Sequence, residues 1–205
     1  EQGVAVHGGC RVREVLFEGA RAVGGRIHVP ESGEREVRAS VVVDASGQSS
    51  LLINRLRLRQ WDPELKKVAV WTYWRGAHRQ TGRDEGATLV LRTKGKKGWF
   101  WYIPLHDDIV SVGAVSDFEH IFPQGAGPLE EAYRRQVENC PGLQPMLEGA
   151  TRCDDYRIQK EYSYRASQAA GDGWVLVGDA FGFLDPLYSS GVLLALTSGG
   201  LAADA

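Results

Sequence analysis

One segment near the C-terminal end constrains the fold more than any other. It runs from Gly173 to Val192 and reads Gly-Trp-Val-Leu-Val-Gly-Asp-Ala-Phe-Gly-Phe-Leu-Asp-Pro-Leu-Tyr-Ser-Ser-Gly-Val. The apolar run from Trp174 to Val177 is typical of a strand covered on both faces, and Gly178 then allows close backbone approach. We predict a buried strand, a glycine-rich turn, a loop and a helix start, which suits a large phosphorylated cofactor.

The polar groups of this segment are placed for such a ligand. Asp179 ends the strand with a carboxylate that can accept hydrogen bonds from sugar hydroxyls. Ser189 or Ser190 is a natural N-cap for the apolar residues 192–196, whose first free N–H groups would point toward negative charge. An ordinary strand-loop-helix unit is the alternative, because glycine and serine are the usual turn residues.

The N-terminal part predicts a second crossing of the same kind. Residues 11–17, 21–29 and 35–43 have strand patterns separated by turn signals, and together they predict an antiparallel meander. The third run leads into Asp44, Ala45, Ser46 and Gly47, before a helix-like stretch at 51–58. A cofactor could approach the backbone closely at this turn as well.

Between these two crossings the sequence changes to long strands rich in aromatic residues. Residues 68–75, 87–93, 98–105 and 109–116 predict one larger sheet, with short helices at 128–138 and 143–148. The lysine-rich turn at 94–98 predicts a solvated hairpin tip.

A pair of tryptophans marks the third strand of this sheet. Trp99 and Trp101 would share one strand face, while Phe100 and Tyr102 would occupy the other. The two indoles would form either a rigid wall or ordinary core packing.

Composition and charge limit the kinds of binding partner that the chain is expected to have. The chain has 205 residues, a net charge of −2 and a pI near 6.3, so its bulk charge predicts neither nucleic acid nor an anionic membrane as partner. No apolar run is long enough for a membrane span. Cys10, Cys140 and Cys153 lack metal-ligand spacing and predict free thiols in the cytoplasm. The histidines form no zinc motif, so we predict no metal site.

The ends of the sequence predict an internal piece of a longer protein. Residue 1 is Glu rather than Met, and no signal peptide precedes the first strand pattern. The helical pattern at 190–205 stops without a terminating glycine or proline.

The motifs together resemble a known family. The sequences Asp44-Ala45-Ser46-Gly47, Gly178-Asp179-Ala180 and Asp185-Pro186 with Ser189-Ser190-Gly191 resemble the second half of FAD-dependent oxidoreductases of the p-hydroxybenzoate hydroxylase fold. Residues 98–104, Gly-Trp-Phe-Trp-Tyr-Ile-Pro, resemble the Gly-Trp-x-Trp-x-Ile-Pro pattern of flavin-dependent halogenases.

This resemblance implies a mixed α/β (α+β) fold. A partial, discontinuous, Rossmann-like FAD-binding domain would comprise residues 1–60 and 160–205. An antiparallel, sheet-rich substrate domain would comprise residues 61–159.

The resemblance also implies roles for individual residues. Asp179 would bind the ribityl or ribose part of FAD. Ser190 and Gly191 would line the halide position, and Trp99 and Trp101 would keep the organic substrate away from the flavin. The implied cofactor-binding residues are Asp44, Ala45, Ser46, Gly47, Gly178, Asp179, Ala180, Pro186, Ser190, Gly191 and Val192.

The implied activity is halogenation. Reduced FAD from a separate flavin reductase would act with oxygen and halide on an electron-rich substrate, either a small molecule or a carrier-bound group. One alternative is another FAD enzyme of the same fold, either similar to geranylgeranyl reductases or similar to aromatic hydroxylases. The second alternative is an inactive flavin-fold fragment.

Two family motifs are missing from the chain. The Gly-x-Gly-x-x-Gly fingerprint does not occur, and none of the lysines matches the position of the family's relay lysine. We therefore predict that the chain by itself is inactive.

Overall fold

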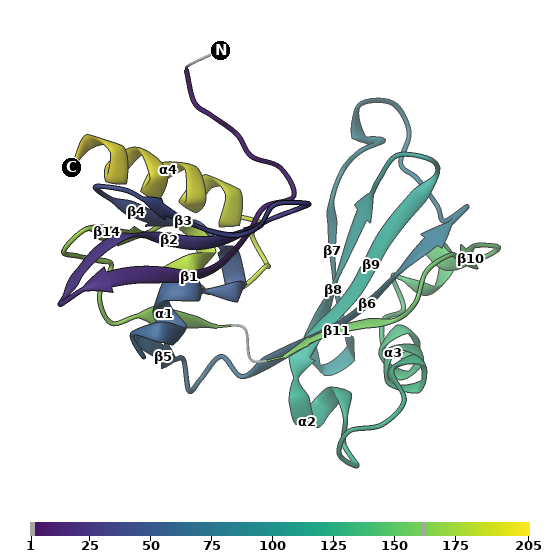
Figure 1. Ribbon diagram of the computed structural model, residues 1–205. Coiled ribbons are helices and arrows are strands. Elements are labelled where there is room, and N and C mark those ends of the chain that lie inside the picture. The colour runs from purple at the N-terminus through teal and green to yellow at the C-terminus, as the bar shows by residue number, and fades with distance from the viewer. Residues whose placement is uncertain (1–2, 161–162) are drawn as a thin grey trace. The chain divides into compact units, whose positions relative to one another are not determined.

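The computed structural model describes residues 3–160 and 163–205, which form two compact units (Figure 1). Unit 1 combines the residues up to Trp61 with Tyr164–Ala205, and unit 2 is Asp62–Ser163. Tyr162, for which the sequence predicts a strand position alternating with Tyr164, lies outside the described residues.

Unit 1 contains the predicted meander in altered form. Its strands are β1 (Arg11–Glu18), β2 (Arg21–Val29) and β3 (Gly33–Arg38), paired antiparallel in the order β1-β2-β3. The prediction of one strand over 35–43 is wrong, because that run divides into β3 and β4 (Val42–Asp44). The Ala39 N–H still donates to Val23 O, whereas the Val42 N–H donates to Gly173 O, in the turn that leads into a strand of a different sheet.

The second sheet of unit 1 positions the two predicted crossings. Here β4 pairs parallel with β14 (Trp174–Leu176), and β13 (Ala170–Gly171) pairs antiparallel with β14. Leu176 lies opposite Asp44 in the parallel register. The turns that follow these two residues therefore leave the sheet at the same edge, where α/β sheets usually bind ligands.

The rest of unit 1 consists of helices and a small sheet. These elements are α1 (Leu51–Arg55), α4 (Gly191–Asp204), β5 (Arg59–Trp61), β12 (Tyr164–Ala166) and β15 (Gly182–Phe183). The helix predicted over 51–58 ends early, because Arg57 adopts a left-handed φ of 55° and β5 follows directly. Leu52, Ile53 and Trp174 pack together in the core of the unit.

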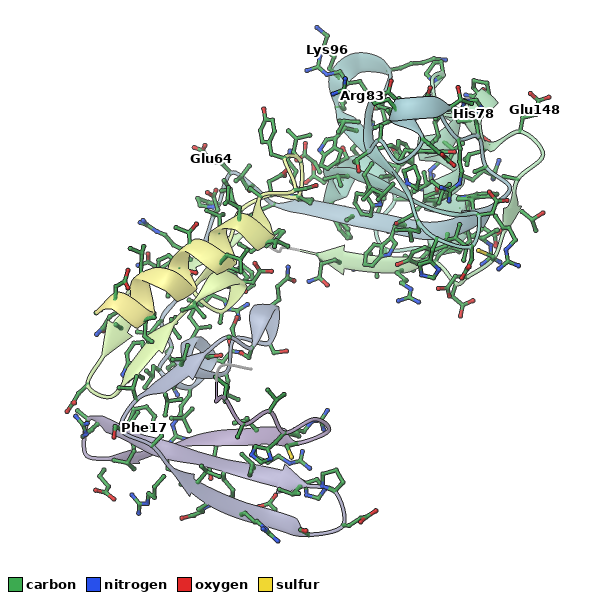
Figure 2. All side chains as sticks on the ribbon, turned by 90° about the horizontal axis from the view of Figure 1, so that it is seen from above. Phe17, Glu64, His78, Arg83, Lys96 and Glu148 are labelled. Carbon is green, nitrogen blue, oxygen red and sulfur yellow. The ribbon has the colours of Figure 1, made fainter. Side chains whose placement is uncertain are left out.

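Unit 2 is built on a six-stranded antiparallel sheet. Its strands are β6 (Lys67–Arg75), β7 (Leu89–Arg92), β8 (Gly98–Pro104), β9 (Ile109–Asp117), β10 (Thr151–Arg152) and β11 (Arg157–Lys160). The order is β10-β6-β9-β8-β7, with β11 also paired to β6. The prediction of one larger sheet is confirmed, and exposed Lys96 marks the solvated tip between β7 and β8 (Figure 2).

One face of this sheet forms the core of unit 2. The helices are α2 (Phe118–Ile121) and α3 (Leu129–Glu138), with a 3-10 turn at Gln144–Leu147. The helix predicted over 128–138 begins one residue later, at Leu129, and Pro128 is its N-cap. Tyr133 of α3 packs edge-on against Phe100 with ring centroids 6.0 Å apart. Phe100 and Tyr102 are buried there, so Trp99 and Trp101 lie on the opposite face.

Candidate functional site

A groove lies at the edge of unit 1 where the parallel strands end. The chain forms 3-10 turns at Gly47–Ser49, shortly after β4, and at Gly178–Ala180, shortly after β14. The groove has a volume of about 490 Å³, within the usual range for small-molecule sites. Its lining residues are Ala45, Gly47, Val177, Gly178, Asp179, Gly191, Val192, Ala195 and Leu196.

This lining brings together residues from both predicted crossings. The predicted residues that line it are Ala45, Gly47, Gly178, Asp179, Gly191 and Val192. The predicted residues that do not line it are Asp44, Ser46, Ala180, Pro186 and Ser190. Sequence reasoning missed Ala195 and Leu196, which follow Gly191 and Val192 by the four-residue spacing of one helix face.

Asp44 holds the first turn instead of lining the groove. Its side chain is buried, and its two oxygens accept hydrogen bonds from the Ser46 N–H at 2.9 Å and the Leu52 N–H at 2.7 Å. The Ser46 hydroxyl in turn accepts the Leu51 N–H at 3.1 Å. These bonds fix the path from β4 into α1, and they place the backbone of Ala45 and Gly47 against the groove.

Tyr164 connects the two turns. Its hydroxyl donates to Asp179 O at 2.7 Å and contacts the Ser50 hydroxyl at 3.0 Å. Burial raises the pKa of Tyr164, so the phenol stays protonated and remains a donor. Ser198 of α4 accepts the Gly178 N–H at 2.9 Å, which ties the helix to the second turn.

The start of α4 reaches the groove through Gly191 and Val192. Ser190 occupies the N-cap position, but its side chain makes no capping bond within the part of the chain that the structure describes. The predicted serine cap is thus wrong as to its side chain, because Ser190 has helical backbone angles (φ −80°, ψ −5°) instead of the extended ones that a side-chain cap needs. The first helical N–H groups are left to a ligand or to water.

The lining chemistry fits part of a flavin nucleotide. A Cβ built at Gly47 meets no described atom within 4 Å, and one built at Gly191 meets only Asp179 Oδ1, at 3.9 Å. At Gly47 and Gly191 the groove is therefore bordered by backbone without a side chain. Burial raises the pKa of the Asp179 carboxyl, which faces the same space and can accept bonds from sugar hydroxyls. The positive end of α4 favours negative charge nearby.

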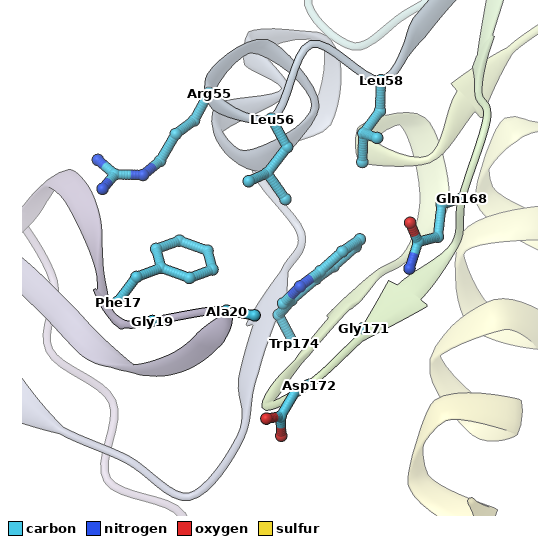
Figure 3. A pocket seen from close by; sticks show the side chains of 10 residues that line it. All are labelled: Phe17, Gly19, Ala20, Arg55, Leu56, Leu58, Gln168, Gly171, Asp172 and Trp174. Carbon is cyan, nitrogen blue, oxygen red and sulfur yellow. The ribbon is translucent and has the colours of Figure 1, made fainter.

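A second hollow in unit 1 is less suited to this role. It measures about 560 Å³ and lies between Phe17, Trp174 and the end of α1 (Figure 3). Its charged groups already have partners in the chain: Arg55 Nη1 lies 3.3 Å from Glu14 Oε2, and Asp172 Oδ1 lies 2.5 Å from Arg21 Nη1. The groove at the strand edge is the stronger candidate.

The tryptophan pair forms part of an indole cluster in unit 2. Trp99 and Trp101 are partly buried, with ring centroids 6.3 Å apart. Trp71 of β6 adds a third ring, 6.0 Å from Trp101. Phe100 and Tyr102 belong to the core of unit 2, whereas the two indoles lie partly buried on the other face of the sheet.

Known proteins are similar to this chain in sequence and in fold. The sequence model of the tryptophan halogenase family matches residues 1–201. The chain belongs to the tryptophan halogenase family. The chain is 36% identical over 207 residues to the tryptophan 2-halogenase of Chondromyces crocatus. The match covers 99% of the chain and 39% of that protein.

Two further proteins support the assignment to the tryptophan halogenase family. A brominase of 1H-pyrrole-2-carbonyl-(peptidyl-carrier protein) from Pseudoalteromonas luteoviolacea is 32% identical over 208 residues, covering 100% of the chain and 50% of that protein. The structure of the myxobacterial chondrochloren halogenase CndH, described as FAD-dependent, matches at 38% identity with a TM-score of 0.83, covering 95% of the chain and 45% of that structure.

The predicted halogenase resemblance and mixed α/β fold are confirmed. The chain spans half or less of the length of these relatives. Among the described residues of this family member, no helix is long and apolar enough to cross a membrane, and no group of three or more His, Cys, Asp or Glu side chains is placed to hold a metal ion.

Proposed function

We propose that the full-length protein is an FAD-dependent halogenase that acts on an electron-rich substrate, and that unit 1 supplies part of its FAD site. One observation supports this most strongly. Two segments far apart in the sequence, each predicted to contact the cofactor, line one groove at the carboxyl ends of paired parallel strands. Unit 2 would form part of the binding site for the organic substrate.

Each residue of the groove has a distinct task in this proposal. Asp179 accepts hydrogen bonds from the hydroxyls of the cofactor. Gly47 and Gly191 lack a Cβ and let it lie against the backbone. The first amides of α4, with Pro186 and Ser190 beside them, would stabilise negative charge on the polar edge of the isoalloxazine ring of FAD. The same amides would hold the halide near Gly191.

A separate flavin reductase would provide FAD in its reduced form. Bound reduced FAD would then supply the chemistry by which oxygen oxidises halide. The chain supplies positioning and the exclusion of water. Trp99 and Trp101 form an apolar wall that keeps the organic substrate away from the cofactor. Trp101 is held at one edge by Ser111, which accepts its indole N–H at 3.1 Å.

The substrate is an electron-rich small molecule or a carrier-bound group. The second option is supported by a relative whose name specifies a substrate on a peptidyl-carrier protein. A cytoplasmic site of action is supported by Cys10, Cys140 and Cys153, which are free thiols in the structure.

The test is bromination by the full-length protein, supplied with FAD, a flavin reductase and bromide in air and assayed with a phenolic trap. We expect bromide-dependent product that is lost in Trp101→Ala. Asp179→Asn should weaken FAD binding, whereas Asp172→Asn, which changes an aspartate of the other hollow, should not. Bound FAD that reoxidises normally without any bromination would reject halogenation and favour a reductase or hydroxylase.

A further inference from the structure

Trp101 lies against β9 in a defined orientation. Its Nε1 donates to the Ser111 hydroxyl at 3.1 Å, and the Ser111 side chain is largely buried. A hydrogen bond from the indole N–H fixes the rotation of the ring as well as its distance from the strand. Ser111 lies two residues from Gly113, on the same face of β9.

Gly113 provides the space for this ring. A Cβ built there would lie 2.1 Å from Cζ2 and 2.3 Å from Cε2 of Trp101. The φ of Gly113 is not in the left-handed region, so the backbone does not require glycine. Glycine weakens a strand interior relative to alanine, and the packing of the indole against Gly113 accounts for its presence there.

Trp71 occupies the other side of the same position. The sheet register places Gly113 opposite Trp101 of β8 and also opposite Trp71 of β6. The two indoles therefore approach across one residue that has no side chain, with centroids 6.0 Å apart and planes at 51°. Trp71 limits how far the Trp101 ring can tilt away from Ser111.

We propose that Ser111 and Gly113 are positioning residues for Trp101, and that Trp71 is the third ring of its wall. Neither Ser111 nor Gly113 takes part in the chemistry. They set the plane of the indole, and through it the shape of the surface that faces the substrate. The geometric part stands on the contacts alone, and only its effect on turnover rests on the proposed halogenase function.

The geometric part is tested by hydrogen exchange of the Trp101 indole N–H, followed by NMR on the full-length protein without FAD. Ser111→Ala should speed this exchange about two- to tenfold, the range that corresponds to one neutral hydrogen bond. Ser111→Thr keeps the hydroxyl and should restore the wild-type rate.

The matched control is Ser116→Ala. Ser116 is a buried serine of the same strand on the opposite face, where its hydroxyl donates to Lys97 O at 2.5 Å. Unchanged exchange in Ser111→Ala, or equal acceleration in Ser116→Ala, would overturn the assignment of Ser111.

Gly113→Ala tests the space beneath the ring. The near-ultraviolet circular dichroism of coupled indoles should change, because the Trp101 ring must move away from Trp71. Gly86→Ala is the control, since a Cβ at Gly86 meets no described atom within 4 Å. An unchanged spectrum in folded Gly113→Ala would refute the role of Gly113. If Gly113→Ala does not fold, the exchange rates of Ser111→Ala and Ser111→Thr still test whether Trp101 is positioned from β9.

Turnover is the second readout. In Ser111→Ala the bromination product per reduced FAD consumed should fall at least twofold, while FAD reoxidation continues and Ser111→Thr restores the yield. A wild-type protein that makes no product contradicts the proposed function but leaves the exchange test intact. Normal yield together with faster exchange would show that the orientation of Trp101 does not govern turnover.

Discussion

Replacement of Asp44 by alanine should collapse the turn that forms one wall of the groove. The carboxylate is 5% exposed and accepts two backbone N–H groups, from Ser46 and from Leu52. Leu52 is fully buried in the core of unit 1. Its amide would lose its acceptor in a place that water reaches poorly.

The expected cost follows from these two bonds. A hydrogen bond to a charged group contributes about 1.5–3 kcal/mol. Loss of both therefore predicts about 3–5 kcal/mol for Asp44→Ala, allowing for partial relaxation. Asp44→Asn keeps one oxygen acceptor but turns a donor toward the other amide, so it should cost less than alanine.

Asp62 offers a matched control in the same chain. Its Oδ1 accepts the Glu64 and Leu65 N–H groups at 2.9 and 3.1 Å, but the side chain is only half-buried. Asp62→Ala should cost about 0.5–2 kcal/mol, as for a turn or helix cap near the surface.

Hydrogen exchange of the segment 44–56, measured by mass spectrometry in the full-length protein, reports the local free energy of opening. Asp44→Ala should speed exchange by about two to three and a half orders of magnitude, since each 1.4 kcal/mol is a factor of ten. Equal effects of Asp44→Ala and Asp62→Ala would refute the reasoning that burial makes the Asp44 bonds strong.

Three further outcomes are expected. Burial raises the pKa of Asp179, so its contribution to stability is fully present below about pH 4, its ordinary value, and is lost as pH rises through the folded-state pKa. Asp179→Asn should therefore raise the urea midpoint relative to wild type more at neutral pH than at acid pH, and a pH-independent difference would contradict this. Tyr164→Phe removes the donor to Asp179 O and should weaken FAD binding about threefold to tenfold by titration, and unchanged affinity would show that the two turns do not need this link. Gly173→Ala should lower the melting temperature by several degrees, because its Cβ would lie 2.3 Å from Ala22 O. Gly33→Ala has the same φ of 74° without any near contact and serves as its control.

Local pattern was sufficient to predict four of the six strands of the sheet in unit 2, whereas the short strands β10 and β11 were not predicted. Regular alternation identified β6, β8 and β9, and a period of two placed Trp99 and Trp101 on one face. The break between β3 and β4 could not be predicted, because residues 39–41, Ala-Ser-Val, contain no glycine or proline. Only the pairing with β14, far along the chain, decides that Val42 leaves the meander.

The sequence predicted several residues that line the groove, but not the hydrogen bonds that hold its two turns in place. Glycine and acidic residues after an apolar run marked Gly47, Gly178 and Asp179. The sequence could not distinguish Asp44, which supports the turn, from the residues that line the groove. Its hydrogen bond from the Leu52 N–H depends on where α1 begins. The bond from Tyr164 to Asp179 O joins residues whose spacing has no sequence signature.

The parallel pairing of β4 with β14 also sets an order of folding. During synthesis the whole of unit 2 leaves the ribosome before β14 does, so β4 must wait for its partner. The Asp62 N–H donates to Ser163 O at 3.1 Å, which brings the two ends of unit 2 together. Once unit 2 has folded, the long loop between β4 and β14 is closed in advance, and most of the entropic cost of joining them has been met. We therefore expect the groove, which needs both β4 and β14, to assemble after unit 2 has folded.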